Sequence, residues 1–127
     1  MKTLRIDFVS DVVCPWCAIG LASLEQALQR RQGEVPADIH FQPFELNPQL
    51  PAEGEGSGEH LQRKYGMSEA QLAENQARIR ERGAELGVVF DFNGRSRIWN
   101  TFDAHRLLHW AGIEGGQADL KHALLRA

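Results

Sequence analysis

Cys14 and Cys17 are the only two cysteines of the 127-residue chain, and Pro15 and Trp16 separate them. A pair at this spacing can form or exchange a disulfide, or it can supply half of a metal site. An alternating apolar run precedes the pair and a helical pattern follows it, so we expect the pair at the start of a helix. Proline suits a first helical turn, where its missing N–H costs no hydrogen bond.

A position at a helix start predicts a reactive thiol. Free N–H groups and the helix dipole favour negative charge there, so the pKa of Cys14 should fall and its thiolate should be a nucleophile. Asp11 and Cys14 are both possible N-cap residues. Cys17 lies one turn further on the same helix face, partly shielded behind Cys14 and near enough to bond to it. The spacing predicts that Cys14 attacks and Cys17 resolves.

A structural zinc site is the alternative interpretation of the pair. Such a site normally closes with four ligands, and His105 and His109 lie four residues apart on a predicted helix. The separation of these histidines from Cys17 matches no zinc-finger spacing, so we favour redox chemistry and expect no metal. His105 is more simply a packed or solvent-facing histidine. Trp16 is either a recognition surface beside the reactive sulfur or a cover for the helix start.

Composition indicates one ordinary globular domain. The chain is 43% hydrophobic and 24% charged, and its net charge of −3 argues against nucleic acid or an anionic membrane as a partner. No apolar run approaches the ~20 residues of a membrane span. The N-terminal residues lead into a strand pattern and not into a secretory signal, which predicts a cytoplasmic location. A lone disulfide there is more often catalytic than structural.

Three elements should position the pair. Alternation predicts a strand over residues 4–9, a helix follows over 14–31, and a second strand spans 39–44. A strand, a helix and a strand in this order predict two parallel strands with a right-handed crossover. The inward stripe of the helix should consist of Cys17, Leu21, Leu24 and Leu28.

The character of the chain changes after this unit. Residues 53–58 form a Gly/Glu linker, and a short helix should follow and end at Gly66. Ser68 and Gln71 form the pattern of a capping box for a helix that ends near Gly87. The short apolar run after it is too brief to classify, and Asn93-Gly94 should turn the chain.

Two further helices are expected near the C-terminus. Asn100 should cap a helix that reaches Trp110, with Phe102, Leu107 or Leu108, and Ala111 as inward candidates, and another helix should follow to about residue 126. The predicted fold class is therefore α/β. The expected division is a core with the cysteine pair over residues 1–47, and a linker and mainly helical domain over 48–127.

The order of these segments resembles the DsbA-like thioredoxin superfamily and, within it, the FrnE-like branch. That branch is related to 2-hydroxychromene-2-carboxylate isomerases and kappa-class glutathione transferases. The resemblance implies a thioredoxin-like βαβ core with an inserted all-α domain, and a cleft where Asn100 and His105 are candidate substrate-binding residues. It is carried by the motif SDVVCPWCAIG at residues 10–20 and by residues 44–48, 64–68, 100–101 and 104–107.

The sequence departs from this family at its end. Family members return to the core with an antiparallel hairpin, a final helix and a cis-proline loop that faces the cysteines. This sequence stops at Ala127 within a helical pattern, so we expect an incomplete core with unpaired strand edges. Self-association or a complementary C-terminal segment is expected to complete it.

The resemblance and the motif together predict a thiol–disulfide oxidoreductase. It should act on a disulfide- or thiol-containing protein or small molecule and require no cofactor, with glutathione as a possible redox partner or cosubstrate. One alternative is a glutathione-dependent isomerase or transferase for small aromatic compounds. The isomerase relatives carry serine where this chain has Cys14, which favours redox chemistry. The other alternative is an inactive truncated fragment.

Overall fold

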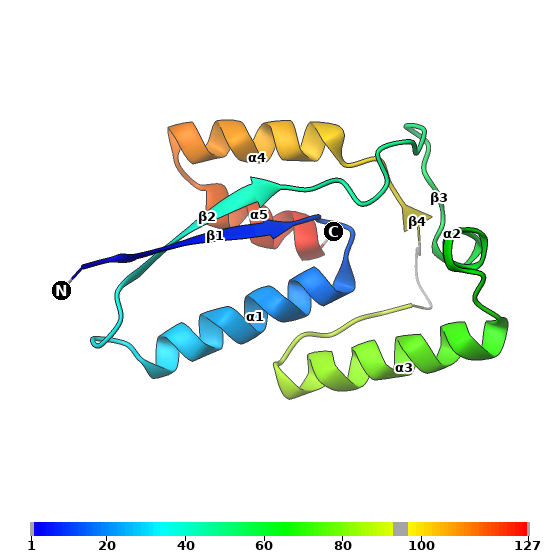
Figure 1. Cartoon of the computed structure of the whole chain (residues 1–127), viewed down its shortest axis with the longest axis horizontal. Coiled ribbons are helices and arrows are strands. Elements are labelled where there is room, and N and C mark those ends of the chain that lie inside the picture. Colours follow the sequence, from blue (N-terminus) through cyan, green and yellow to red (C-terminus); the bar gives the residue numbers. More distant parts are fainter. Residues whose placement is uncertain (1, 93–96, 127) are drawn as a thin grey trace. The chain divides into compact units, whose positions relative to one another are not determined.

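The computed structural model describes residues 2–92 and 97–126, which form two compact units (Figure 1). The first unit comprises Met1–Pro48 and Thr101–Ala127, and the second comprises Gln49–Asn100. This division differs from the predicted one, which placed all of 48–127 in a linker and helical domain. Residues 101–127 instead pack with the first unit, because their helices contact its second strand.

The first unit contains the predicted βαβ motif. Strand β1 (Leu4–Ser10) leads into helix α1 (Pro15–Arg30), and strand β2 (Ala37–Pro43) follows. The strands are parallel and pair over their whole length, from Leu4 opposite Ala37 to Ser10 opposite Pro43. The expected parallel pairing is therefore confirmed.

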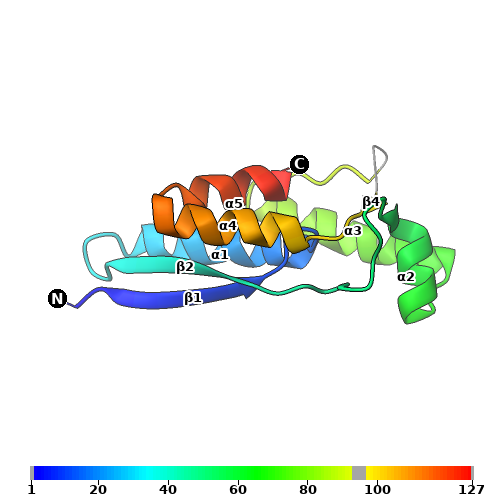
Figure 2. The same cartoon turned by 90° about the horizontal axis from the view of Figure 1, so that it is seen from above.

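One face of this two-stranded sheet carries the core. Along β1, Arg5, Asp7 and Val9 are exposed, as expected when alternate side chains point to opposite faces. On the other face, the Phe8 and Phe41 rings meet edge to face at 5.9 Å. The helices of the unit lie on the same side of the strands (Figure 2).

Two C-terminal helices complete the first unit. Helix α4 (Phe102–Glu114) and helix α5 (Gln117–Arg126) join through Gly115 and Gly116, whose φ values of 105° and 83° suit glycine. On α4, Leu108 and Ala111 are buried as predicted. Of the alternatives Leu107 and Leu108, Leu107 is the exposed one. Phe102 is also exposed, which corrects that inward candidate, because contacts with β2 and α5 select the other face of the helix.

The side chain of Gln117 joins three elements of this unit. Its Oε1 accepts a hydrogen bond from the Phe41 backbone N–H at 3.2 Å, and its Nε2 donates to the Leu108 carbonyl at 3.0 Å. Nε2 also approaches the Phe41 carbonyl at 3.4 Å. The start of α5 is therefore fixed against both β2 and α4.

The second unit consists of helix α2 (Ser57–Tyr65), helix α3 (Glu69–Glu85) and the short strands β3 (Glu55–Gly56) and β4 (Arg97–Ile98). The capping box of Ser68 and Gln71 is present, and Gly66 ends α2 at a φ of 64°, both as predicted. The antiparallel β3–β4 pair was not predicted. The expected turn at 93–94 lies outside the described residues.

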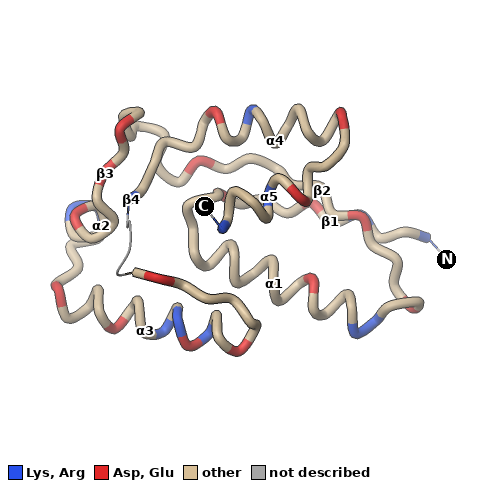
Figure 3. Tube along the Cα trace, turned by 180° about the vertical axis from the view of Figure 1, so that it is seen from behind, with Lys and Arg blue, Asp and Glu red and all other residues tan. Residues whose placement is uncertain are grey.

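Charged side chains are frequent along α3, where red and blue segments alternate in Figure 3. Arg82 and Glu85 form an ion pair on its exposed surface. Within residues 2–92 and 97–126, no helix combines the length and apolar character that crossing a membrane requires.

Candidate active site

The cysteine pair lies at the start of α1, as the sequence predicted. Cys14 is the N-cap residue with extended backbone angles (φ −100°, ψ 112°), and a proline stands in the first turn. The Cys14 carbonyl accepts hydrogen bonds from the backbone N–H of Cys17 at 3.1 Å and of Ala18 at 3.3 Å. The first turn holds no acidic side chain, so no carboxylate there opposes a thiolate.

The two thiols are unbonded, partly exposed and in hydrogen-bonding contact. A hydrogen bond with Cys14, and another from the Asp11 backbone, lower the pKa of Cys17 to about 6, and burial acts in the opposite direction. The same hydrogen bond between the two thiols, together with burial, raises the pKa of Cys14. The lowered pKa therefore falls on Cys17 in this arrangement, whereas the N-cap argument expected it on Cys14. The first of the two thiol protons to dissociate is shared by both cysteines, because each sulfur stabilises the negative charge on the other.

Asp11 is almost completely buried and organises the loop between β1 and α1. Its Oδ1 accepts a hydrogen bond from the Val12 backbone N–H at 2.8 Å and lies 3.1 Å from His105 Nε2. Its Oδ2 accepts one from the Leu46 N–H at 2.9 Å. Asp11 therefore ties the cysteine loop to the segment after β2 and to α4, and it does not act as the N-cap of α1.

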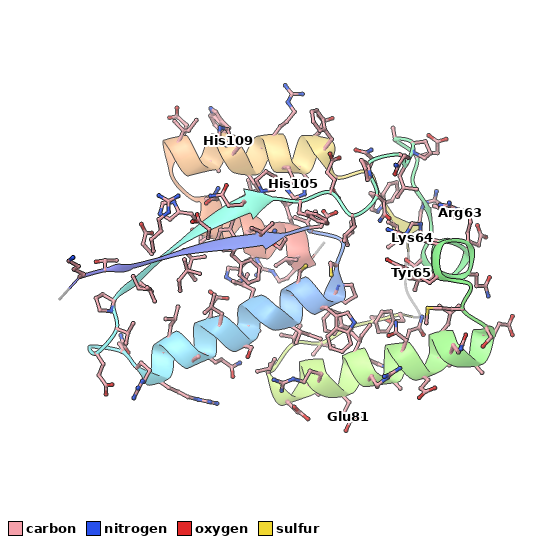
Figure 4. All side chains as sticks on the ribbon, viewed as in Figure 1. Arg63, Lys64, Tyr65, Glu81, His105 and His109 are labelled. Atoms are coloured by element: carbon pink, nitrogen blue, oxygen red, sulfur yellow. The ribbon has the colours of Figure 1, made fainter. Side chains whose placement is uncertain are left out.

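His105 is buried on α4, where Figure 4 labels it with His109. Its Nε2 donates to Asp11, so the prediction of a packed histidine agrees with its position. His105 therefore lies next to the loop that carries the cysteines. Its described hydrogen bond is made to the protein itself.

Lys121 is a further buried polar residue of this unit and is only 1% exposed. It projects from α5, with its Nζ 5.8 Å from the centre of the Phe41 ring. Burial lowers the pKa of Lys121, and the negative charges of Cys17, Asp11 and Cys14 act in the opposite direction. The lysine is therefore within electrostatic reach of both thiols.

The remaining predicted site residues lie elsewhere. Trp16 is partly exposed in the first turn of α1. Asn100 belongs to the second unit, where its side-chain amide donates to the Leu50 carbonyl at 2.9 Å. It is not the N-cap of α4, which is Thr101. Within the described part of the chain, no three His, Cys, Asp or Glu side chains are grouped to hold a metal ion.

Two residues of this site were missed or assigned another role from the sequence. Asp11 was identified only as a possible N-cap. Its position three residues before Cys14 was a signal that it could belong to the site. Lys121 was not identified at all. Its signal is its helical spacing from Gln117 and Leu124, two partly buried residues, which puts a charged residue on an inward stripe.

Comparisons with known proteins relate the chain to one family and to similar proteins. A family model for the DSBA-like thioredoxin domain matches residues 5–127. The structure of a probable DsbA oxidoreductase, SCO1869 from Streptomyces coelicolor, superposes with a TM-score of 0.88 at 31% identity, over 97% of this chain and 53% of that one. The uncharacterised protein YwbO of Bacillus subtilis (strain 168) is 41% identical over 46 residues, which are 36% of this chain and 21% of YwbO. The chain thus spans about half the length of the solved relative.

Proposed function

Because the chain belongs to the family of DSBA-like thioredoxin domains, we propose that it is a thiol–disulfide oxidoreductase that uses Cys14 and Cys17. The observation that carries this proposal is the placement of two contacting thiols at the start of α1, with a pKa lowered to about 6 on one of them. A thiol with such a pKa is mostly thiolate at neutral pH. The description of the solved relative as a probable DsbA oxidoreductase supports the same activity.

In the proposed reaction, the Cys14 thiolate attacks one sulfur of a substrate disulfide. A bond forms between Cys14 and that sulfur, the substrate disulfide breaks, and the other substrate sulfur leaves as a thiolate. Cys17 then loses its proton and attacks the Cys14 sulfur. The Cys14–Cys17 disulfide forms and the second substrate thiolate leaves, so the substrate is reduced by two electrons and the protein is oxidised. The reverse sequence oxidises a dithiol substrate.

Cys14 is the proposed nucleophile because it occupies the N-cap. Hydrogen bonds from the backbone of Cys17 and Trp16 favour charge on its sulfur, and these are the groups that a helix start provides. Charge shared with Cys17 can move to Cys14 when Cys17 keeps the proton. Trp16, partly exposed beside Cys14, is a candidate contact for the substrate.

The sequence and the family together suggest the substrate, the redox partner and the location that we propose. The substrate is a disulfide- or thiol-containing protein or small molecule, glutathione serves as a redox partner, and the location is cytoplasmic.

Strand β1 exposes Leu4 and Val9 and, within the described residues, pairs only with β2. We therefore also propose self-association, or binding of a complementary segment, through this strand. Sedimentation and thermal unfolding at several concentrations test it; a monomer with a concentration-independent transition would contradict it.

Turnover of insulin disulfides, with glutathione as the electron source, tests the activity. The reduced protein should cleave them, and Cys14→Ala should abolish the reaction. Trp110→Ala is a suitable control because Trp110 is exposed on the surface of α4. A glutathione-dependent isomerisation of a hydroxychromene carboxylate that survives Cys14→Ala, without insulin cleavage, would overturn the proposal and support the isomerase alternative.

A further inference from the structure

The side chain of Lys121 places a buried ammonium group within electrostatic reach of the cysteine pair, and the proposed reaction assigns it no role. Lys121 is 1% exposed, although lysine is almost never fully buried without a partner. Burying an ammonium group is costly unless charged groups nearby compensate. The negatively charged groups that offset the cost of burying the Lys121 charge therefore indicate its role.

The negatively charged partners of Lys121 come from the active-site end of the unit. Cys17, Asp11 and Cys14 all act on the lysine, and Cys17 has the strongest effect of the three. Asp11 already receives hydrogen bonds from Val12, Leu46 and His105. The thiols gain and lose charge during the reaction, so the compensation of Lys121 changes with their redox state.

We infer that Lys121 is a buried cation that stabilises the thiolate of Cys17 and thereby makes the pair a stronger oxidant. This inference rests on the proposed function and assigns a residue that acts on the resolving cysteine. Stabilising a thiolate favours the reduced form, in which a thiolate exists, over the disulfide, which has no charge to stabilise. Lys121 should therefore shift the equilibrium toward reduction of this protein and oxidation of its substrate.

The mixed-disulfide stage depends on this cation most. When Cys14 is bonded to substrate, it has no thiol proton to donate to Cys17, so the largest source of stabilisation of the Cys17 thiolate is lost. The Asp11 backbone and the Lys121 charge remain. Lys121 thus acts when Cys17 has to lose its proton to release the substrate.

Two histidines lie with Lys121 among the described residues that line one pocket. His105 and His109 of α4 line the same small pocket as Lys121, together with Phe41 and Leu108. His105 is bonded to Asp11, which also opposes the burial cost of the lysine. Both variants keep these histidines, so the test compares the variants at matched pH.

The test is the redox equilibrium of Lys121→Met with glutathione, because methionine keeps the length of the side chain and removes its charge. An opposite charge nearby lowers an acid pKa by about 1–3 units, so its removal should raise the pKa of Cys17 from about 6 to about 7. At pH 7 this change should favour the disulfide about fivefold, equivalent to about 20 mV. At pH 5 both variants are protonated and the difference should nearly vanish.

A matched control and a second measurement separate the possible outcomes. Lys64→Met removes an exposed lysine of α2 and should leave the equilibrium unchanged at both pH values. In a Cys14→Ser background, thiolate absorbance should show that Lys121→Met raises the pKa of Cys17 by about one unit.

The results distinguish this inference from the proposed function. If neither the unmodified protein nor Lys121→Met exchanges with glutathione, the proposed function fails. If both proteins exchange and have the same redox equilibrium at pH 7, the inference about Lys121 alone fails. A shift of equal size at pH 5 and pH 7 would also overturn it, because it would show a structural effect on the two redox forms. An unchanged Cys17 pKa in the Cys14→Ser background would do the same.

Discussion

Replacement of Asp11 by alanine should destabilise the first unit strongly. Asp11 is 1% exposed and takes part in three hydrogen bonds, with Val12, Leu46 and His105. Alanine removes the acceptor and leaves these donors without it. The loss therefore affects the loop before α1, the segment after β2 and helix α4 at once.

The magnitude follows from the burial of each donor. The contact with His105 is fully buried, and an unsatisfied buried donor costs about 1–3 kcal/mol. The two backbone donors are part-buried, where water can replace the carboxylate, so each contributes about 0.5–1 kcal/mol. We expect a total loss of about 3 kcal/mol in the free energy of unfolding, a large share of the ~5–15 kcal/mol of a typical domain.

Urea unfolding at fixed protein concentration measures this loss. Asp103→Ala is the matched control, because Asp103 is 87% exposed and its ion pair with Arg106 lies on the surface of α4. That control should change stability by less than ~1 kcal/mol. Asp11→Asn keeps one acceptor oxygen and should lose an intermediate amount, which provides a measurable variant if Asp11→Ala does not fold.

A double-mutant cycle identifies the pair responsible. His105→Ala and Asp11→Ala should be non-additive, with a coupling of about 1–3 kcal/mol, because the two side chains share a hydrogen bond. A loss below ~0.5 kcal/mol for Asp11→Ala, or additive effects of the two changes, would refute the reasoning that Asp11 is the organising acceptor of this region.

Two further predictions concern the thiols and the second unit. Thiolate absorbance and the alkylation rate of the reduced protein should rise as pH increases through about 6, because the pKa of Cys17 is depressed to about 6. The stability that this thiolate gives the reduced form should be lost as pH falls through the same value. A single midpoint near ~8.5, the value of a free cysteine, would contradict this. Gly83→Ala should cost about 1–3 kcal/mol in urea unfolding, because its Cβ would lie 2.7 Å from both the Phe90 ring and the Val88 carbonyl. Gly20→Ala, whose nearest contact would be 3.9 Å, is the control, and an equal cost for both would show that the overlap is not the cause.

Local signals in the sequence were sufficient to predict several elements. The alternation in β1, the proline after Cys14 and the Ser68–Gln71 pattern each act within a few residues, and each element is present. The parallel pairing of β1 and β2 followed from the helix between them, since a crossover connection joins parallel strands. These predictions needed no knowledge of contacts between distant segments.

The features that were missed depend on distant contacts. Strands β3 and β4 are two residues each, too short for a periodic pattern, and their pairing joins segments that lie far apart in the sequence. Asn100 has the residue type of an N-cap, but its amide bonds to Leu50. The inward face of α4 and the burial of Lys121 both depend on packing against β2, which a helical period alone does not predict.

Trapping of the mixed disulfide tests the roles of the two cysteines most directly. Cys17→Ser, reduced and then mixed with oxidised glutathione, should retain one glutathione on Cys14, because no second thiol remains to release it. Intact mass before and after reduction, with peptide mapping, identifies the adduct. The double variant lacking both thiols is the control. Cys14→Ser should trap little or nothing; equal trapping in the two single variants, or an adduct only on Cys17, would contradict the assignment of Cys14 as nucleophile and Cys17 as resolving cysteine.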